Sequence, residues 1–344
     1  METMPFFTMG ISCSTLLQGL HTADKCAGST PLSRALAYCA AVSVSFVGSL
    51  YLLVPSSVRK LDRNDARQIR WRTLSTSIVC AGALFALPYF IESDSSSSIH
   101  GLFTVILESQ NPSECIKALW DFSVRTGKQT SLILLHTSIL YLGPILQNLL
   151  QVHIYLSDGV SKDGKSYTLK EFFSTLYKVY VADKVNLFAA FESDKSRTNE
   201  RWVLLRNLLI APLSEEIAFR ACISTMLSCC STLTTKQVAL ISPLFFGTAH
   251  AHHSFLLYQR GIALPRIALQ TAFQLTYTSV FGSYVSYMYL MSGSVIVVST
   301  CHSFCNAMGL PDMSFLRPNS PLYRYRKSLL TAHVAGLVAF VVTI

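Results

Sequence analysis

The chain has 344 residues, of which 51% are hydrophobic and only 14% are charged, and its mean hydropathy is +0.40. Soluble domains carry charge on about a quarter of their residues, so this composition excludes an ordinary soluble domain and indicates that the bilayer is the solvent. The formal net charge of +9 lies in segments between apolar runs without interleaved aromatic residues, which argues against nucleic acid as a partner and favours membrane lipid.

Hydrophobic windows long enough to cross about 30 Å of hydrocarbon as helices follow one another along the chain. Strands are excluded, because an open sheet cannot leave its backbone unpaired in lipid and these runs lack the alternation of a barrel. We therefore predict an all-α, polytopic membrane helix bundle of about eight transmembrane helices, forming a single domain over residues 1–344. The predicted spans are residues 35–54, 73–91, 129–151, 201–228, 236–260, two helices within 267–311 joined at 292–294, and 328–344.

The basic residues predict how the bundle is oriented. Six of them lie in residues 59–72 and several more in 162–197, so both segments are expected to face the cytosol. The loop of residues 92–128 then lies on the opposite side, and residues 169–191 are expected to lie along the cytosolic membrane surface. The ten cysteines show no paired spacing and are expected to be small core residues.

Three charged side chains fall within residues 211–220, where a charge at mid-membrane costs roughly 2.5 to 3.5 kcal/mol to insert. Glu216 and Arg220 are spaced i and i+4 on one helical face, which predicts a structural ion pair. Glu215 points about 100° away from that pair and has no such partner along the helix. We therefore interpret Glu215 as a functional carboxylate.

Two histidines and one asparagine provide further candidates. His302 lies inside the uncharged run 267–311, and Asn306 follows it on the same helical face. A structural interpretation of this pair is an interhelical hydrogen bond that holds the bundle together. His250 ends its span on the cytosolic side, one turn after Phe246, where a histidine can also simply meet lipid headgroups.

Glu215, His250, His302 and Asn306 come from three predicted helices, and the predicted topology places all four in the cytosolic half of the bundle. A carboxylate can accept a proton from water, and imidazole and amide groups can donate to an oxyanion, so the set suits hydrolysis of an acyl bond. Nearby hydroxyls and thiols lack a nucleophile signature, so we favour activated water over covalent catalysis. These neighbours are Cys222, Ser299, Thr300, Ser303 and Cys305.

Three short motifs carry these residues on separate helices: Glu215-Glu216-Ile-Ala-Phe-Arg220, Phe246-Gly-Thr-Ala-His250 and His302-Ser-Phe-Cys-Asn306. In their order and topology, and in the Met308-Gly-Leu-Pro311 that follows, the chain resembles the type II CAAX prenyl endopeptidase family, the Ras-converting CAAX proteases. The eukaryotic branch is the more similar one. The resemblance is concentrated in residues 201–311, which are expected to hold the catalytic motifs.

The resemblance implies an intramembrane endopeptidase that removes the C-terminal tripeptide from farnesylated or geranylgeranylated CAAX proteins, such as Ras-like small GTPases. It assigns Glu215 and His250 to the activation of water, and His302 and Asn306 to the oxyanion site. Three further residues are expected to support this site: Glu216, Arg220 and Phe246. The resemblance also implies no metal and no cofactor, and a multi-pass protein of the endoplasmic reticulum membrane whose active site opens to the cytosol.

Two alternatives stay open. In a zinc-dependent membrane protease, Glu215, His250 and His302 would be ligands, although the usual HExxH helix is absent. In a transporter or a non-enzymatic scaffold, the same polar residues would line a solute path or hold the bundle together, but the chain shows no inverted repeat. Within the protease interpretation, Arg220 could instead bind the substrate's terminal carboxylate, but its predicted pairing with Glu216 makes this the weaker alternative.

Overall fold

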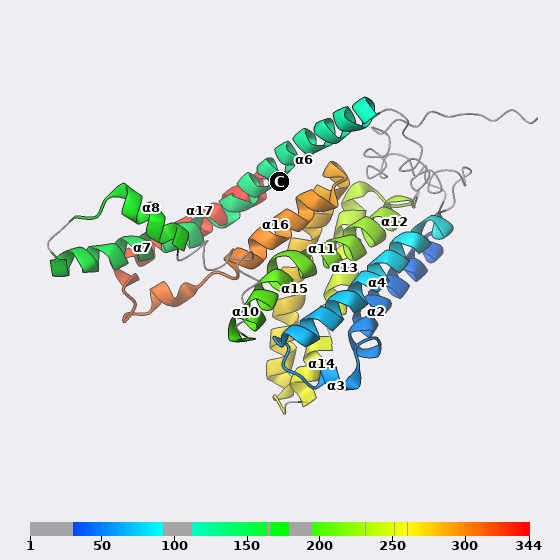
Figure 1. Ribbon diagram of the computed structural model, residues 1–344, viewed down its shortest axis with the longest axis horizontal. Coiled ribbons are helices and arrows are strands. Elements are labelled where there is room, and N and C mark those ends of the chain that lie inside the picture. Colours follow the sequence, from blue (N-terminus) through cyan, green and yellow to red (C-terminus); the bar gives the residue numbers. More distant parts are fainter. Residues whose placement is uncertain are drawn as a thin grey trace, which may run out of the picture. The chain divides into compact units, whose positions relative to one another are not determined.

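The computed structural model describes residues 30–91, 112–163, 166–178, 195–230, 232–250, 252–259 and 261–344 (Figure 1). These residues form helices and no strand, which confirms the all-α class. The elements are α2 (Leu32–Leu52), α3 (Ser56–Arg59), α4 (Ala66–Phe90), α6 (Pro112–Leu140), α7 (Leu142–Asp163), α8 (Leu169–Tyr177), α10 (Lys195–Leu205), η4 (Arg206–Ile210), α11 (Ala211–Glu216), η5 (Ile217–Ser224), α12 (Thr225–Ser228), α13 (Thr235–His250), α14 (His252–Gln259), α15 (Leu264–Ser292), α16 (Val295–Met308), η6 (Met313–Leu316), η7 (Tyr323–Tyr325) and α17 (Arg326–Thr343).

Three helices among the described residues are long and apolar enough to cross a membrane: Leu32–Leu52, Ala66–Phe90 and Tyr323–Thr343. A bent pair, Trp120–Leu140 with Leu142–Asp158, makes four if it is counted as one span. These helices support a polytopic helical membrane bundle, while the number eight stays a prediction. Much of the predicted loop 92–128 and most of the predicted surface segment 169–191 lie outside the described residues, apart from α6 and α8.

The predicted span 129–151 is not one straight helix, because the chain bends by 76° between α6 and α7, so this pair forms either one broken span or a re-entrant loop. The bend falls at Tyr141, whose amide N–H donates to the Ser138 carbonyl in a tightened turn. Pro144 has no amide hydrogen to return to the Leu140 carbonyl and disfavours the helical conformation of the residue before it, so the helix cannot run on through this point.

The other long apolar run, 267–311, does form two helices as predicted. Helix α15 ends at Ser292, and Gly293 takes a left-handed conformation with φ of 65° before α16 begins. A glycine reaches this conformation without the steric penalty of a Cβ atom, so it stops α15 and lets the chain reverse.

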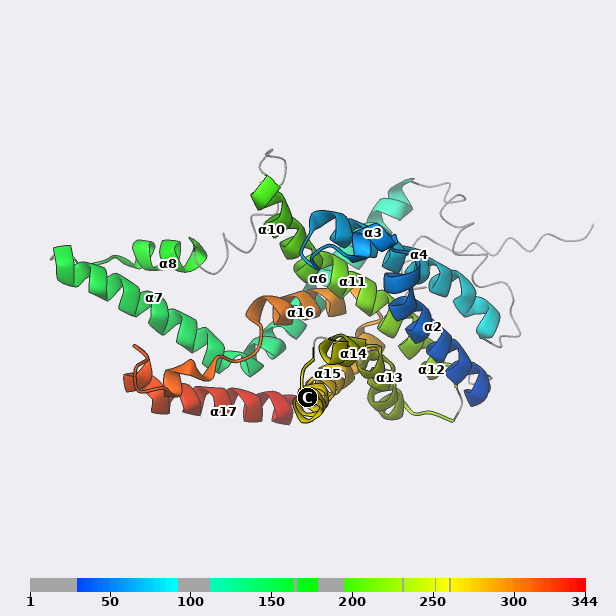
Figure 2. The ribbon, with the colours of Figure 1, turned by 90° about the horizontal axis from the view of Figure 1, so that it is seen from below.

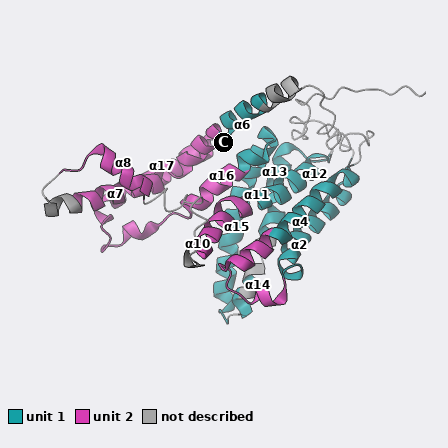
Figure 3. Ribbon diagram, in the orientation of Figure 1, with its two compact units in different colours: residues 1–54, 74–130, 213–298 teal, residues 55–73, 131–212, 299–344 magenta. Residues whose placement is uncertain are grey.

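The described residues divide into two compact units (Figure 3), the first within residues 1–54, 74–130 and 213–298 and the second within 55–73, 131–212 and 299–344. In the first unit α2 runs antiparallel to the segment from α11 to α12. The Thr30 N–H donates to the Cys229 carbonyl over 3.4 Å at one end, and the rings of Phe46 and Phe219 lie 5.4 Å apart further along. Cys39 and Cys222 fill the interface between these contacts, where both are fully buried.

Helices α13 and α15 lie side by side in the first unit (Figures 1 and 2). Small residues let their backbones approach: a Cβ atom on Gly282 would come within 2.8 Å of the Pro243 ring. The hydroxyls of Ser242 and Ser286 share a hydrogen bond of 2.8 Å across the same interface. Close backbone contact and an interhelical hydrogen bond together fix the register of α15 against α13.

In the second unit α17 packs along α7. Gly143 leaves no room for a side chain beside the His333 ring, and Gly336 approaches the Ile139 carbonyl in the same way. Phe315 and Leu329 are fully buried at the centre of a smaller core next to this helix pair. The glycines therefore allow α17 to approach the chain closely where it bends between α6 and α7.

One cysteine, Cys229, is buried like the others, but it forms a bond that the sequence did not predict. The free cysteines among the described residues, Cys305 apart, are all buried, in agreement with the prediction: Cys39, Cys80, Cys222, Cys230 and Cys301. Cys229, which directly follows α12, is instead disulfide-bonded. The scattered spacing of the cysteines gave no sign of this bond, since connectivity cannot be deduced from sequence.

Candidate active site

The helical segment that carries Glu215 is irregular. The short α-helix α11 lies between two π-helical stretches, η4 before it and η5 after it. A π-turn contains an extra residue and leaves backbone carbonyls displaced from their usual partners, and such turns are frequent at functional sites. In η5 two side-chain hydroxyls provide hydrogen bonds to such carbonyls: Ser224 Oγ donates to the Phe219 carbonyl over 3.1 Å, and Thr225 Oγ1 donates to the Arg220 carbonyl over 3.5 Å.

The predicted ion pair between Glu216 and Arg220 is confirmed. Arg220 Nε lies 3.1 Å from Glu216 Oε2, Nη1 donates to Oε1 over 3.2 Å, and both side chains are at most 1% exposed. The guanidinium also lies 5.0 Å from the centre of the Phe246 ring, and a Cβ atom on Gly282 would come within 3.5 Å of Arg220 Nη2. Because only 1% of the Arg220 side chain is exposed, it offers no surface to a substrate carboxylate.

Glu215 sits one residue before this pair but in a different environment. It is half-buried, whereas Glu216 is completely buried. The adjacent Ser214 carbonyl accepts a hydrogen bond from the Cys80 thiol over 3.4 Å, which fixes this turn against α4. Glu215 therefore retains accessible surface in a segment whose other carboxylate is neutralised.

Tyr277 on α15 is a neighbour of Glu215 that the sequence did not indicate. The two side chains are close enough to interact electrostatically. Their proximity follows from the register of α15, because Tyr289 shares a hydrogen bond with Thr225 and Gly282 meets Arg220 further along the same helix. Nothing in the sequence distinguishes Tyr277 from the other tyrosines of α15, so only the register shows which of them faces Glu215.

The first unit also carries the second motif. Phe246 is buried in α13, and its ring packs against the Phe219 ring with 5.0 Å between centroids. His250 is the last residue of α13, one turn beyond Phe246, and its side chain lies outside the described residues. The structure thus places the Phe246 end of this motif against the ion pair.

The third motif lies on α16 in the second unit. His302 is buried, with 7% of its surface exposed, while Asn306 is exposed. Asn306 Nδ2 donates to the Asn207 carbonyl over 3.0 Å, and Ser303 Oγ donates to the Leu208 carbonyl over 2.6 Å. Both carbonyls belong to the π-helical stretch η4, so α16 provides the donors that this stretch requires.

These contacts qualify two expectations. Ser303, considered as a nucleophile, points its hydroxyl at backbone carbonyls, including that of Ser299 at 2.8 Å. Asn306 does act as an interhelical hydrogen-bond donor, as the structural interpretation expected. Because a primary amide has two N–H groups and only one meets Asn207, the contact also orients Asn306 while leaving a second donor.

Comparison with known proteins gives consistent results. A family model described as Type II CAAX prenyl endopeptidase Rce1-like matches residues 197–308. The chain is 31% identical to the human CAAX prenyl protease 2 over 304 residues, which is 88% of this chain and 77% of that protein. It is 26% identical to the Arabidopsis thaliana CAAX prenyl protease 2 over 319 residues, covering 91% and 89% of the two chains. The Caenorhabditis elegans CAAX prenyl protease 2 is 38% identical over 140 residues. No solved structure matches.

Proposed function

The chain belongs to the type II CAAX prenyl endopeptidase family, and on that premise we propose that it removes the last three residues from proteins whose CAAX cysteine carries a farnesyl or geranylgeranyl group. The proposed substrates include Ras-like small GTPases. The observation that carries the proposal is the contrast between two adjacent glutamates. Arg220 neutralises the buried Glu216, whereas Glu215 keeps accessible surface and is the carboxylate that can meet water.

In the proposed reaction Glu215, aided by His250, accepts a proton from water, and the hydroxide adds to the carbonyl carbon of the prenylated cysteine. The carbonyl oxygen gains a negative charge, which His302 and Asn306 stabilise by donating hydrogen bonds. The C–N bond to the next residue then breaks, and the proton on Glu215 passes to the leaving amine. The products are a prenylcysteine carboxylate and a free tripeptide.

We further propose that the site opens to the cytosol from the endoplasmic reticulum membrane. Disulfides persist in oxidising compartments, so Cys229 and the adjoining start of α2 at Thr30 belong on the lumenal side. Helix α2 leads from there to the basic segment 59–72, which the positive-inside rule assigns to the cytosol. Glu215 precedes Cys229 by 14 residues, about 21 Å of helix, which favours the cytosolic half of a hydrocarbon layer about 30 Å thick.

The test of this function compares a farnesylated CAAX peptide with its unprenylated twin, using purified protein in detergent or vesicles. We expect release of the terminal tripeptide from the prenylated peptide only, because the prenyl chain partitions into lipid and brings the peptide to a membrane-embedded site. Mass spectrometry of the products locates the cut. Release of no tripeptide from either peptide would contradict the proposal and leave a transporter or scaffold.

Asn306→Ala is expected to lower kcat for the prenylated peptide by about 10²–10³-fold, the usual effect of losing one oxyanion donor. Asn306→Asp should be at least as harmful, since an aspartate cannot donate to the Asn207 carbonyl and places negative charge where the oxyanion forms. Cys305→Ala on the same helix is the matched control and should keep activity. A fully active Asn306→Ala protein would remove this residue from the oxyanion site.

Chelation tests the proposed absence of metal. We expect tripeptide release to persist after prolonged treatment with a strong chelator, because the sequence has no HExxH helix and Glu215 is proposed as base rather than ligand. Metal content is measured by elemental analysis in the same sample. Activity that disappears and returns on addition of zinc would instead make Glu215, His250 and His302 a ligand set.

A further inference from the structure

A CAAX substrate presents two negative charges to the enzyme: the oxyanion that forms at the cleaved bond, and the free carboxylate at its C-terminus. The oxyanion is assigned to His302 and Asn306 in the proposed reaction, whereas the carboxylate has no assigned partner. The peptide ends in a free α-carboxylate three residues beyond the cleaved bond, and such a group near a lipid-embedded site requires hydrogen-bonded compensation. Arg220 does not supply it, because it is 1% exposed and paired with Glu216. A cation close to the proposed oxyanion residues of the second unit is therefore the better candidate.

Arg206, the first residue of η4, is such a cation. It directly precedes Asn207, whose carbonyl accepts the hydrogen bond from Asn306. An extended tripeptide spans about 10 Å, so its terminal carboxylate can reach the neighbourhood of Arg206 when its scissile carbonyl lies at Asn306. Arg206 is half-buried, so it is less exposed to water than an arginine on the open surface.

The Arg206 side chain is held in one position. Its Nη1 donates to the Arg63 carbonyl over 3.0 Å and to Asn64 Oδ1 over 3.2 Å, and its Nε donates to Asn207 Oδ1 over 3.0 Å. Among the described residues, no partner is found for Nη2. The guanidinium is thus oriented by neutral acceptors and keeps a donor edge and its full charge for a ligand.

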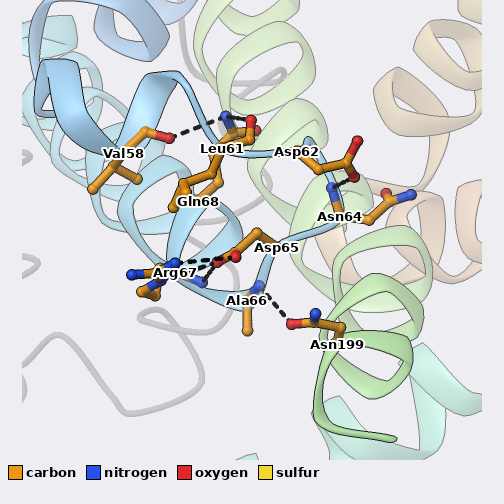
Figure 4. A network of polar contacts seen from close by, with 9 residues as sticks. All are labelled: Val58, Leu61, Asp62, Asn64, Asp65, Ala66, Arg67, Gln68 and Asn199. Atoms are coloured by element: carbon orange, nitrogen blue, oxygen red, sulfur yellow. Dashed lines mark hydrogen bonds and ion pairs between the residues drawn. The ribbon is translucent and has the colours of Figure 1, made fainter. Parts of the chain in front are cut away.

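The segment of residues 58–68, which includes the Arg63 and Asn64 acceptors of Arg206, is held in place by further hydrogen bonds (Figure 4). The Gln68 amide donates to the carbonyls of Val58, Arg59 and Leu61, over 3.3, 3.3 and 2.9 Å. The Ala66 N–H donates to Asn199 Oδ1 over 3.0 Å, which ties this segment to α10. The Arg63 carbonyl and Asn64 are therefore presented to Arg206 by a preorganised loop, which reduces the entropy lost on binding.

The local charge favours an anion. Arg63 and Arg72 both lie within electrostatic range of Arg206, whereas the acidic residue in range is Asp62. Three arginines and one aspartate within this range leave excess positive charge, and Arg63 is exposed and can contact part of a ligand. We infer that Arg206, assisted by Arg63 and Arg72, binds the free α-carboxylate of the substrate's C-terminal residue, an inference that rests on the proposed function.

The experiment compares two farnesylated peptides of the same sequence, one with a free C-terminal carboxylate and one with a C-terminal amide. Wild-type protein is expected to cleave the carboxylate peptide with kcat/KM about ten- to hundredfold higher, the range of a hydrogen bond to a charged group. Arg206→Gln should remove most of that preference by weakening cleavage of the carboxylate peptide alone, and Arg206→Lys should restore part of it. Lys60→Gln, an exposed charge in the same basic segment, should leave the preference unchanged.

The outcomes separate this inference from the function on which it rests. Failure of wild type to cleave either peptide overturns the proposed function. Equal cleavage of both peptides by wild type keeps the protease but overturns carboxylate recognition, and a preference retained by Arg206→Gln overturns the site. If Arg206→Gln lowers cleavage of both peptides equally and only in vesicles containing anionic lipid, Arg206 binds a lipid headgroup instead. Thermal unfolding of each variant shows that the comparison is made on folded protein.

Discussion

Replacing Glu215 by glutamine is expected to lower kcat for tripeptide release by about 10²–10⁴-fold, the range supplied by a positioned general base. Glutamine has nearly the shape of glutamate but cannot accept a proton from water. Glu215 is half-buried and not part of the Glu216–Arg220 ion pair, so the substitution should leave unfolding little changed. Single-turnover assays on the farnesylated peptide measure the chemical step, and thermal unfolding measures stability.

The matched control for this variant is Glu171→Gln. Glu171 caps α8 by accepting hydrogen bonds from the N–H and hydroxyl of Thr168, contacts that a glutamine oxygen can replace. It loses the same charge without belonging to any catalytic motif, and its activity should equal that of wild type. A Glu215→Gln protein that cleaves as fast as the control would show that another group activates the water.

Loss of Arg220 is expected to be the most destabilising single change in the ion pair. Arg220→Met leaves the Glu216 carboxylate buried without a counterion, which typically costs about 3–5 kcal/mol. The double variant Glu216→Leu with Arg220→Met removes both charges and should recover much of that loss, because well-packed apolar residues replace buried ion pairs at little cost. Denaturation in mixed micelles measures the free energy of unfolding of wild type, the single variant and the double variant.

The exposed pair of Asp65 and Arg67 provides the contrast. Arg67 Nε lies 3.4 Å from Asp65 Oδ1, but 67% of the arginine side chain is exposed. Surface ion pairs contribute about 0–1 kcal/mol, so Arg67→Met should scarcely change stability. If Arg220→Met were as mild as Arg67→Met, or if the double variant were as unstable as the single one, Glu216 and Arg220 would not be energetically coupled.

The sequence was informative where a local rule decides the outcome. Charge-free runs predicted α2, α4 and α17, and the i, i+4 spacing predicted the contact of Glu216 with Arg220. A single residue, Gly293, accounts for the turn inside residues 267–311, and the small residues there did indicate it. In each case the interaction depends on residues close together in the chain.

Features that depend on packing were not predicted. The bend at Tyr141 was missed because its apolar run continues through Pro144 without interruption in hydropathy. The approach of Tyr277 to Glu215 depends on the register of α15, and the bond from Asn306 to the Asn207 carbonyl depends on an irregular backbone. Hydrophobic periodicity does not indicate which backbone carbonyls lose their helical partners in a π-helical stretch.

The two π-helical stretches around α11 have a consequence for how this segment tolerates change. Each contains one residue more than an α-helical turn of the same rise, and its displaced carbonyls meet fixed hydroxyl or amide donors. Deleting one residue from η5 would relax it to a regular helix and rotate every later position by about 100°. Between Arg206 and Ser224, the number of residues is therefore expected to be constrained more strictly than the identity of most of them.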